Sequence, residues 1–179
     1  MKRSLKEKTI NIRSNFCCDE EYFNLVNDII YNPVTLEMKK FIQHGTTTCY
    51  EHCLNVSYKS YKLAKFLKLD YRSVARAGML HDLFLYDWHK KDETGMFLFK
   101  RHGFSHPRTA LNNALKYFSL NEIEKDCILN HMWPLTIKMP KYKEAYAIIL
   151  MDKIACLQET LPELNTFKVL KKRLLRYSM

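Results

Sequence analysis

Hydrophobic residues recur every three or four positions along most of this chain, the spacing of one face of an α-helix. Between residues 20 and 30, for example, Phe23, Val26 and Ile30 fall on one face, and Pro33 follows the end of the pattern. No segment alternates between apolar and polar positions over a useful length, so no β-strand is predicted. The pattern predicts an all-α protein.

Residues that favour helix N-termini indicate where several helices begin. One of the three threonines at 46–48 is expected to cap a long helix that runs to about residue 69. Asp70 caps a helix that ends in the doublet His81-Asp82, and Asn121 caps one that ends before Trp133-Pro134. Other helices are predicted at residues 35–43, ending at His44-Gly45; at 105–118, opening at Ser105-His106 with Pro107 in the first turn; at 141–160; and, as a basic helix, from about residue 163.

The longest irregular segment is expected at residues 83–104, where aromatic and charged side chains mix without helical spacing. The small residues Ala75, Ala77 and Gly78 predict a close approach of a neighbouring helix. Residues 1–18 are interpreted as a basic N-terminal arm, and residues 19–179 as a single helical domain.

The chain is basic, with 29 Lys and Arg against 19 Asp and Glu, which favours anionic partners such as phosphorylated molecules. Many lysines occupy scattered helical positions typical of solvated faces, so nucleic acid is not the favoured partner. No apolar segment is long enough to span a membrane, and the six cysteines form no C-x-x-C pair. The first residues lack an apolar core segment, so we expect no signal peptide there. We expect reduced thiols, no zinc site made by these cysteines, and a cytoplasmic protein.

The candidate chemistry lies in four polar residues at positions that helical spacing directs inward: His52, the doublet His81-Asp82, and Asp152. Each has a structural alternative when taken singly: a hydrogen-bonded core histidine, or a buried Asp152 paired with Lys153 or Arg76. Together they form a mixed nitrogen and oxygen set suited to a divalent ion such as Mn, Fe, Co, Ni or Zn.

The order His52, His81-Asp82, Asp152 resembles the H…HD…D signature of the HD-domain phosphohydrolase superfamily, over residues 43–160. The segments QHGTTTCYEHC, LHDLFLYDWH, HGFSHP and NHMWPL are also similar to a little-characterised group of bacterial HD proteins. The resemblance implies an HD-domain helical bundle that holds one or two divalent ions, Mg among the candidates, and hydrolyses phosphate esters.

The resemblance also assigns roles to individual residues. His106 and His131 correspond to ligands of a second ion, with Asp82 as the bridge, although His106 has an alternative role as a helix cap. The implied metal ligands are His52, His81, Asp82, His106, His131 and Asp152. The candidate catalytic residues are Asp82, His106 and Lys153, and the candidate substrate-binding residues are Arg101, Lys153 and His44. Arg101 and Lys153 have the alternative of being plain surface charges.

The implied substrate is a nucleotide or another small phosphate ester, attacked by water that the metal makes reactive near neutral pH. The alternative is a catalytically silent HD module that binds a nucleotide, a metal or RNA in a regulatory role. Trp133 either stacks on a base or fills the core, and the core is favoured. His89 and His102 have no assigned role, and the oligomeric state stays open.

Overall fold

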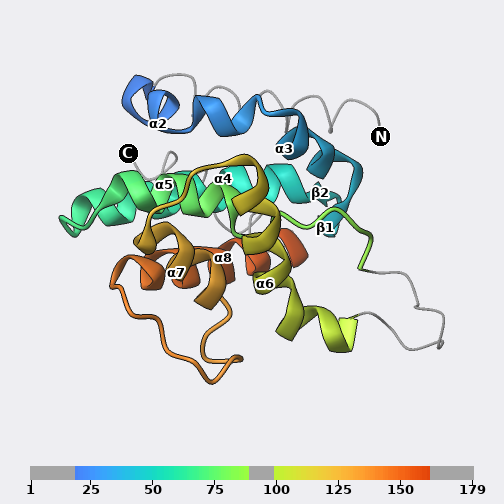
Figure 1. Cartoon of the computed structure of the whole chain (residues 1–179). Coiled ribbons are helices and arrows are strands. Elements are labelled where there is room, and N and C mark those ends of the chain that lie inside the picture. The colour runs from blue at the N-terminus through green and yellow to red at the C-terminus, as the bar shows by residue number, and fades with distance from the viewer. Residues whose placement is uncertain (1–18, 89–98, 162–179) are drawn as a thin grey trace, which may run out of the picture.

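The structure is a computed structural model that describes residues 19–88 and 99–161, without the side chains of residues 99–103. Within these ranges the chain forms seven α-helices, one short 3-10 helix and a sheet of two short strands (Figure 1). The predicted all-α class is confirmed for this part of the chain, apart from the small sheet. The predicted arm at residues 1–18 and the predicted basic helix from residue 163 lie outside the described residues.

Three groups of helices enclose the core. In Figure 1, the first two helices cover one side of a central pair, α4 and α5, while α7 and α8 lie on the other side with α6 alongside. Tyr22, Val26, Tyr61, Met79 and Ile148 belong to the fully or almost fully buried core. The elements are α2 (Glu20–Ile30), α3 (Pro33–Glu37), η1 (Met38–Lys40), β1 (Ile42–His44), β2 (Thr47–Thr48), α4 (Cys49–Phe66), α5 (Tyr71–Leu80), α6 (Phe99–Tyr117), α7 (Glu122–Asn130) and α8 (Glu144–Thr160).

The three predicted caps start their helices as expected. The Thr48 side chain accepts a hydrogen bond from a backbone amide of the first turn of α4, within a reciprocal capping box. Asp70 accepts two backbone amide hydrogen bonds at the start of α5, and Asn121 forms a capping box at the start of α7. These contacts satisfy amides that otherwise lack a partner at a helix N-terminus.

The small residues of α5 allow α4 to approach closely, as predicted. The Ser57 hydroxyl donates a hydrogen bond of 2.6 Å to the backbone oxygen of Ala75. A Cβ atom placed on Gly78 lies only 2.7 Å from the Cα atom of Ser57. Gly78 therefore sets the distance between α4 and α5, the two helices that carry His52 and His81.

The helix predicted at residues 35–43 is wrong over its second half. The helical segment ends at Lys40, and Ile42–His44 is the extended strand β1, which pairs antiparallel with β2. Gly45 turns the chain between the two strands with a φ of +56°, a backbone conformation that residues with a side chain rarely adopt. Pairing with β2 and this turn override the helical spacing, and they direct Gln43 inward.

The start of α6 also differs from the prediction. The helix begins at Phe99, so Pro107 lies in its interior rather than in its first turn, and His106 is not an N-cap residue. A proline inside a helix removes one backbone hydrogen bond. The helix α6 nevertheless continues through Pro107 and packs against α7, a tertiary contact that local sequence rules do not take into account. Of the irregular segment predicted at residues 83–104, residues 83–88 are irregular, residues 99–104 belong to α6, and residues 89–98 lie outside the described residues. The chain between α7 and α8, residues 131–143, is also irregular.

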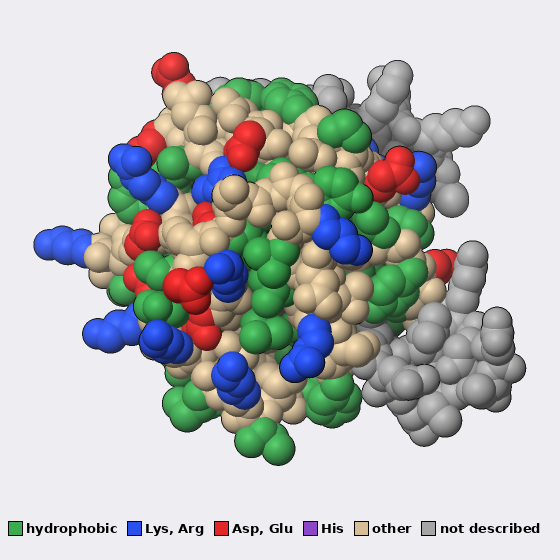
Figure 2. All heavy atoms as spheres, in the orientation of Figure 1, with side chains coloured by type: hydrophobic (Ala, Val, Ile, Leu, Met, Phe, Trp, Pro, Cys, Tyr) green, Lys and Arg blue, Asp and Glu red, His purple; other side chains and the backbone are tan. Residues whose placement is uncertain are grey.

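Charged side chains of both signs occupy the face of the molecule shown in Figure 2. Lys and Arg side chains alternate with acidic ones on the face shown in Figure 2, without a concentrated basic patch there. Arg76, for instance, pairs with Asp28 and Glu124, and Lys65 pairs with Glu21. Among the described helices, none has the length and apolar character needed to cross a membrane.

Candidate metal centre

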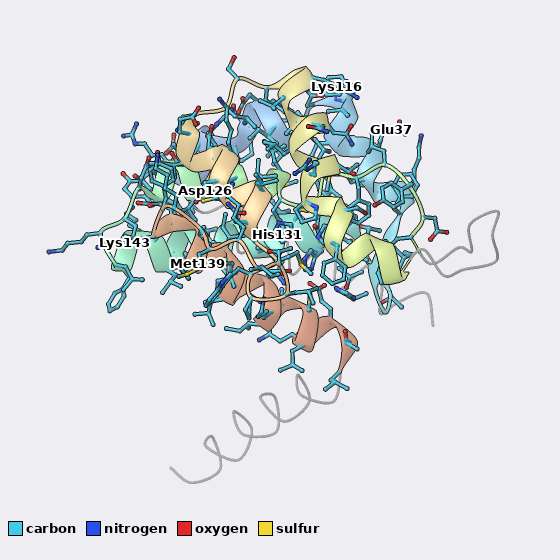
Figure 3. All side chains as sticks on the ribbon, turned by 60° about the horizontal axis from the view of Figure 1, so that its bottom comes forward. Glu37, Lys116, Asp126, His131, Met139 and Lys143 are labelled. Atoms are coloured by element: carbon cyan, nitrogen blue, oxygen red, sulfur yellow. The ribbon has the colours of Figure 1, made fainter. Side chains whose placement is uncertain are left out.

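The structure gathers the six predicted metal ligands into one buried cluster. They come from α4, the end of α5, α6, the end of α7 and α8. Each of the six residues is at most 6% exposed, and Figure 3 shows His131 in the middle of the bundle. The members of this cluster are His52, His81, Asp82, His106, His131 and Asp152.

One half of the cluster is formed by His52, His81 and Asp152. The Nε2 atom of His52 lies 3.1 Å from Oδ1 of Asp152, and the Nε2 atom of His81 lies 3.7 Å from the same oxygen. The ring centroids of His52 and His81 are 5.5 Å apart. One ligand atom from each residue fits within 4.8 Å of the other two, so these three side chains can hold one metal ion.

The other half is formed around Asp82. Its Oδ1 atom lies 3.3 Å from Nε2 of His106 and 3.5 Å from Nε2 of His131. The two histidine Nε2 atoms are themselves 2.9 Å apart. Since His81, Asp82 and His131 also form a compact group of possible ligands, the two halves share His81.

The Nδ1 atoms of three histidines are held by hydrogen-bond acceptors. His81 and His131 follow the last residues of α5 and α7, and each donates from Nδ1 to the backbone oxygen three residues earlier, over 2.8 Å. The Nδ1 atom of His52 donates to Oε2 of Glu159, also over 2.8 Å. Each contact fixes the ring so that Nε2 faces the carboxylates, the arrangement typical of metal-binding histidines.

Burial and mutual contacts act in opposite directions on the pKa values of the cluster. Burial by itself raises the pKa of Asp82 and Asp152, but the facing imidazoles lower both well below the usual value. Burial lowers the pKa of His52 and His81, but their carboxylate neighbours raise both well above the usual value. The ionised carboxylates therefore require positive charge beside them. Protons on the histidines and a bound metal cation can each supply this charge, and they compete for the same nitrogen atoms.

Two buried atoms of the cluster form no hydrogen bond within the described part of the chain: Nε2 of His81 and Oδ1 of Asp82. Their nearest opposite partners lie at 3.3–3.7 Å, longer than ordinary hydrogen bonds to nitrogen. Leaving a buried donor or acceptor without a hydrogen bond costs about 1–3 kcal/mol. A divalent ion bound between these two atoms would remove that cost. The nitrogen and oxygen atoms of the cluster therefore fit the ligand atoms that a metal requires.

The sequence prediction missed several residues that contact the cluster, among them Gln43, Glu159 and Cys156. Gln43 donates from its side-chain amide to Oδ2 of Asp82 over 2.7 Å, and Glu159 supports His52. The Sγ atom of Cys156 lies 3.4 Å from Oδ1 of Asp152. Cys156 and Glu159 follow Asp152 by four and seven positions, so their helical spacing on one face was a usable signal.

A cavity of about 870 Å³ opens beside the cluster. Asp82, His106, His131 and Asp152 contribute to its polar part. Its apolar lining comes from different segments of the chain and comprises Trp88, Phe104, Met132, Leu135, Leu157 and Leu161. This volume lies within the range of ligand sites, which are commonly apolar with a few polar groups that orient the ligand.

The predicted substrate-binding residues have different outcomes. Lys153 is exposed and His44 is partly buried, and both line the cavity. The Lys153 ammonium also lies 3.4 Å from the backbone oxygen of Trp133. The side chains of Arg101 and His102, and the whole of His89, lie outside the described residues.

Two structural alternatives from the sequence are wrong. Asp152 is paired with neither Arg76, which contacts Asp28 and Glu124, nor Lys153, which contacts a backbone oxygen. Trp133 is only partly buried and packs edge-to-face on Tyr146, so it does not belong to the buried core. The tryptophan that reaches the cavity is Trp88.

The cysteines of the described residues, at positions 49, 53, 127 and 156, are free, in agreement with the expected reduced thiols. Cys156 nevertheless belongs to a group of possible metal ligands with His44 and His52.

The comparisons with known proteins identify no family: no protein-family model, curated protein or solved structure matches this chain.

Proposed function

We propose that this protein is a metal-dependent phosphohydrolase with an HD-domain helical bundle, acting on a nucleotide or another small phosphate ester. The support is chemical. Four histidines and two aspartates, from α4, α6, α8 and the ends of α5 and α7, form one cluster at the wall of a ligand-sized cavity. Their chain order is that of the H…HD…D signature, extended by the two intervening histidines.

The observation that carries this proposal is the orientation of His81 and Asp82. Both are buried, and an atom of each, Nε2 and Oδ1, is directed into the cluster without a hydrogen bond from the described residues. The Nδ1 atom of His81 donates a hydrogen bond to the backbone oxygen of Gly78, so the ring edge that carries Nε2 is the one that meets the carboxylates. A core built only for stability has no reason to retain such groups.

The two halves of the cluster suit two ion positions, of Mn, Fe, Co, Ni, Zn or Mg. His52, His81 and Asp152 form one, and Asp82 with His106 and His131 forms the other. When bound, divalent ions acidify water and polarise a phosphoryl oxygen. Gln43 holds Oδ2 of Asp82, which leaves Oδ1 directed toward the two histidines.

The remaining residues bind and orient the ester. The phosphate group lies against the polar part of the cavity, and the Lys153 ammonium at the exposed edge offsets its negative charge. Water attacks phosphorus, the bond between phosphorus and the ester oxygen breaks, and the departing alcohol takes a proton. His44, which lines the same cavity, is placed to donate that proton from its ring.

Elemental analysis of the purified full chain tests the proposal. The wild-type protein should retain one or two equivalents of a divalent metal, and the His81→Ala, Asp82→Ala double variant should lose them. Glu122→Ala, which removes a carboxylate with a 75% exposed side chain, is the matched control and should retain the metal. A wild-type protein that binds no divalent ion after reconstitution contradicts the proposal.

A second double variant, His106→Ala with His131→Ala, determines the number of ions. If each half of the cluster holds one, this variant should retain one equivalent where the wild type has two. The position formed by His52, His81 and Asp152 contains neither residue and should stay intact.

A screen of phosphate esters with the metal-loaded protein separates catalysis from binding. Turnover that disappears in the His81→Ala, Asp82→Ala variant supports the phosphohydrolase. Bound metal without turnover of any ester supports the alternative, a silent HD module that binds a nucleotide, metal or RNA. RNA binding can be read separately, as a gel shift that weakens with salt.

A further inference from the structure

Cys156 places a sulfur atom at the edge of the candidate metal centre. It lies one helical turn after Asp152 on α8, lines the cavity, and has its Sγ atom 3.4 Å from Oδ1 of Asp152. On its other side, Sγ lies 3.1 Å from Nε2 of His44. Cys156 is therefore one member of a row of potential ligands rather than an isolated cysteine.

The distances around Asp152 resemble those between ligands of one ion. For tetrahedral zinc, bonds of about 2.0–2.3 Å separate nitrogen from oxygen by roughly 3.3 Å and sulfur from oxygen by roughly 3.5 Å. Oδ1 of Asp152 lies 3.1 Å from His52 and 3.7 Å from His81, besides the 3.4 Å to sulfur. The buried Nε2 atom of His81 forms no hydrogen bond within the described residues and lies 3.7 Å from this oxygen and 3.6 Å from Oδ2 of Asp82.

We propose that Cys156 is a fourth ligand for a thiophilic divalent ion, with Zn²⁺ as the natural representative, at the position formed by His52, His81 and Asp152. The inference rests on the proposed function, because it concerns the same site. Thiolate sulfur selects soft ions such as Zn²⁺ over Mn²⁺ and Mg²⁺, which prefer oxygen ligands.

These four ligands regulate catalysis through the number of coordination positions on the ion that stay open for water or substrate. Four protein ligands complete a tetrahedral zinc shell, as in structural sites, whereas catalytic sites keep a position for water or substrate. A hard ion that does not recruit Cys156 has only three protein ligands here and keeps open positions. Zn²⁺ therefore inhibits at this position, while Mn²⁺ or Mg²⁺ supports turnover.

The imidazole of His44 lies on the other side of the sulfur, with its Nε2 atom 3.1 Å from Sγ. His44, His52 and Cys156 also form a compact group of possible ligands. The contact with His44 therefore positions Cys156 beside the site formed by His52, His81 and Asp152.

Cobalt titration of the full-length metal-free protein tests the inference without relying on activity. Co²⁺ bound through a thiolate gives an intense sulfur-to-metal charge-transfer band in the near ultraviolet, and this band should be present in the wild type. Cys156→Ser should abolish it, and Cys127→Ser, a buried cysteine of α7 absent from the described cavity lining, should retain it. Cys156→Ser should also weaken Zn²⁺ binding at least about tenfold and leave Mn²⁺ affinity within about twofold.

The outcomes are distinguishable from those of the proposed function. Cobalt that binds with only weak visible bands, or a charge-transfer band that survives Cys156→Ser, overturns the role of Cys156 and leaves the metal centre in place. Failure of any ion to bind overturns both. Turnover of a phosphate ester with Mn²⁺ that Zn²⁺ inhibits in the wild type, but not in Cys156→Ser, supports the closed zinc state.

Discussion

His52 and Glu159, which are 107 positions apart in the chain, share a hydrogen bond of 2.8 Å between Nδ1 and Oε2. The opposite nitrogen of the ring, Nε2, faces Asp152. Asn55 donates to the second carboxylate oxygen of Glu159 over 3.2 Å, which holds the acid in place. Glu159 therefore orients His52 and raises its basicity as a ligand without touching the metal position itself.

Replacement of Glu159 by alanine should weaken metal binding about 10- to 100-fold, because His52 loses the acceptor that orients its ring. Glu159→Gln retains an acceptor oxygen and should lose less. Metal affinity measured by competition with a chelator checks both variants. Gln158→Ala, one position earlier, removes a contact with Lys59 and should leave affinity unchanged. Equal affinities for Glu159→Ala and the wild type contradict the role of Glu159.

Metal removal should lower the free energy of unfolding, because an ion that binds only the folded state stabilises it. At an ion concentration about 100 times the dissociation constant, the gain is about 2.7 kcal/mol. For a chain of this size that corresponds to roughly 5–11 °C in Tm, measurable by thermal unfolding with and without chelator. In the His81→Ala, Asp82→Ala variant the same ion should produce no shift, and an undiminished shift there places the ion elsewhere.

Gly78→Ala should destabilise the fold by about 1–3 kcal/mol, the usual effect of extra volume in a packed core. The added methyl group lies 2.7 Å from the Cα atom of Ser57, and backbone cannot move aside as a flexible side chain can. Denaturant unfolding of the two proteins gives the difference. Arg72→Ala, at an exposed position of the same helix, should stay within about 0.5 kcal/mol of the wild type.

The apolar lining of the cavity predicts that ligand affinity rises with the length of an alkyl group beside a phosphonate. Each methylene that becomes buried contributes about 0.8 kcal/mol, or roughly fourfold in Kd. Calorimetric titration of the metal-loaded protein with a series of alkyl phosphonates measures this slope. Leu157→Ala should reduce it, and Ile137→Ala, at a residue that is 98% exposed and outside the described lining, should not. A Kd independent of chain length excludes apolar recognition.

Much of the candidate site follows from local patterns. Helical spacing identifies His52 and Asp152 as inward-facing, and both are buried on α4 and α8. The caps Thr48 and Asp70 determine where α4 and α5 begin. These features depend on residues within one or two helical turns, which is the range that propensity and periodicity describe.

The two wrong element boundaries have a common cause. Ile42 and Gln43 have helical spacing but belong to the strand β1, which pairs with β2. The helix α6 continues through Pro107 and packs against α7. In both segments the deciding contact comes from another element. Local preference amounts to less than about 1 kcal/mol for most residues and to about 3 kcal/mol for a proline inside a helix, which contacts with several other residues can offset.

By itself, the sequence determined the helical class, the capped starts of α4, α5 and α7, and the four inward residues His52, His81, Asp82 and Asp152. Only the resemblance to a known signature added His106 and His131. Only the tertiary structure decided which ring nitrogen of each histidine faces which carboxylate. It also brought three further side chains into contact with the cluster, those of Gln43, Cys156 and Glu159. The physical reason is that helical periodicity specifies the buried face of a helix but not its partner. Close packing selects the partner, through approaches such as that of Gly78 to Ser57.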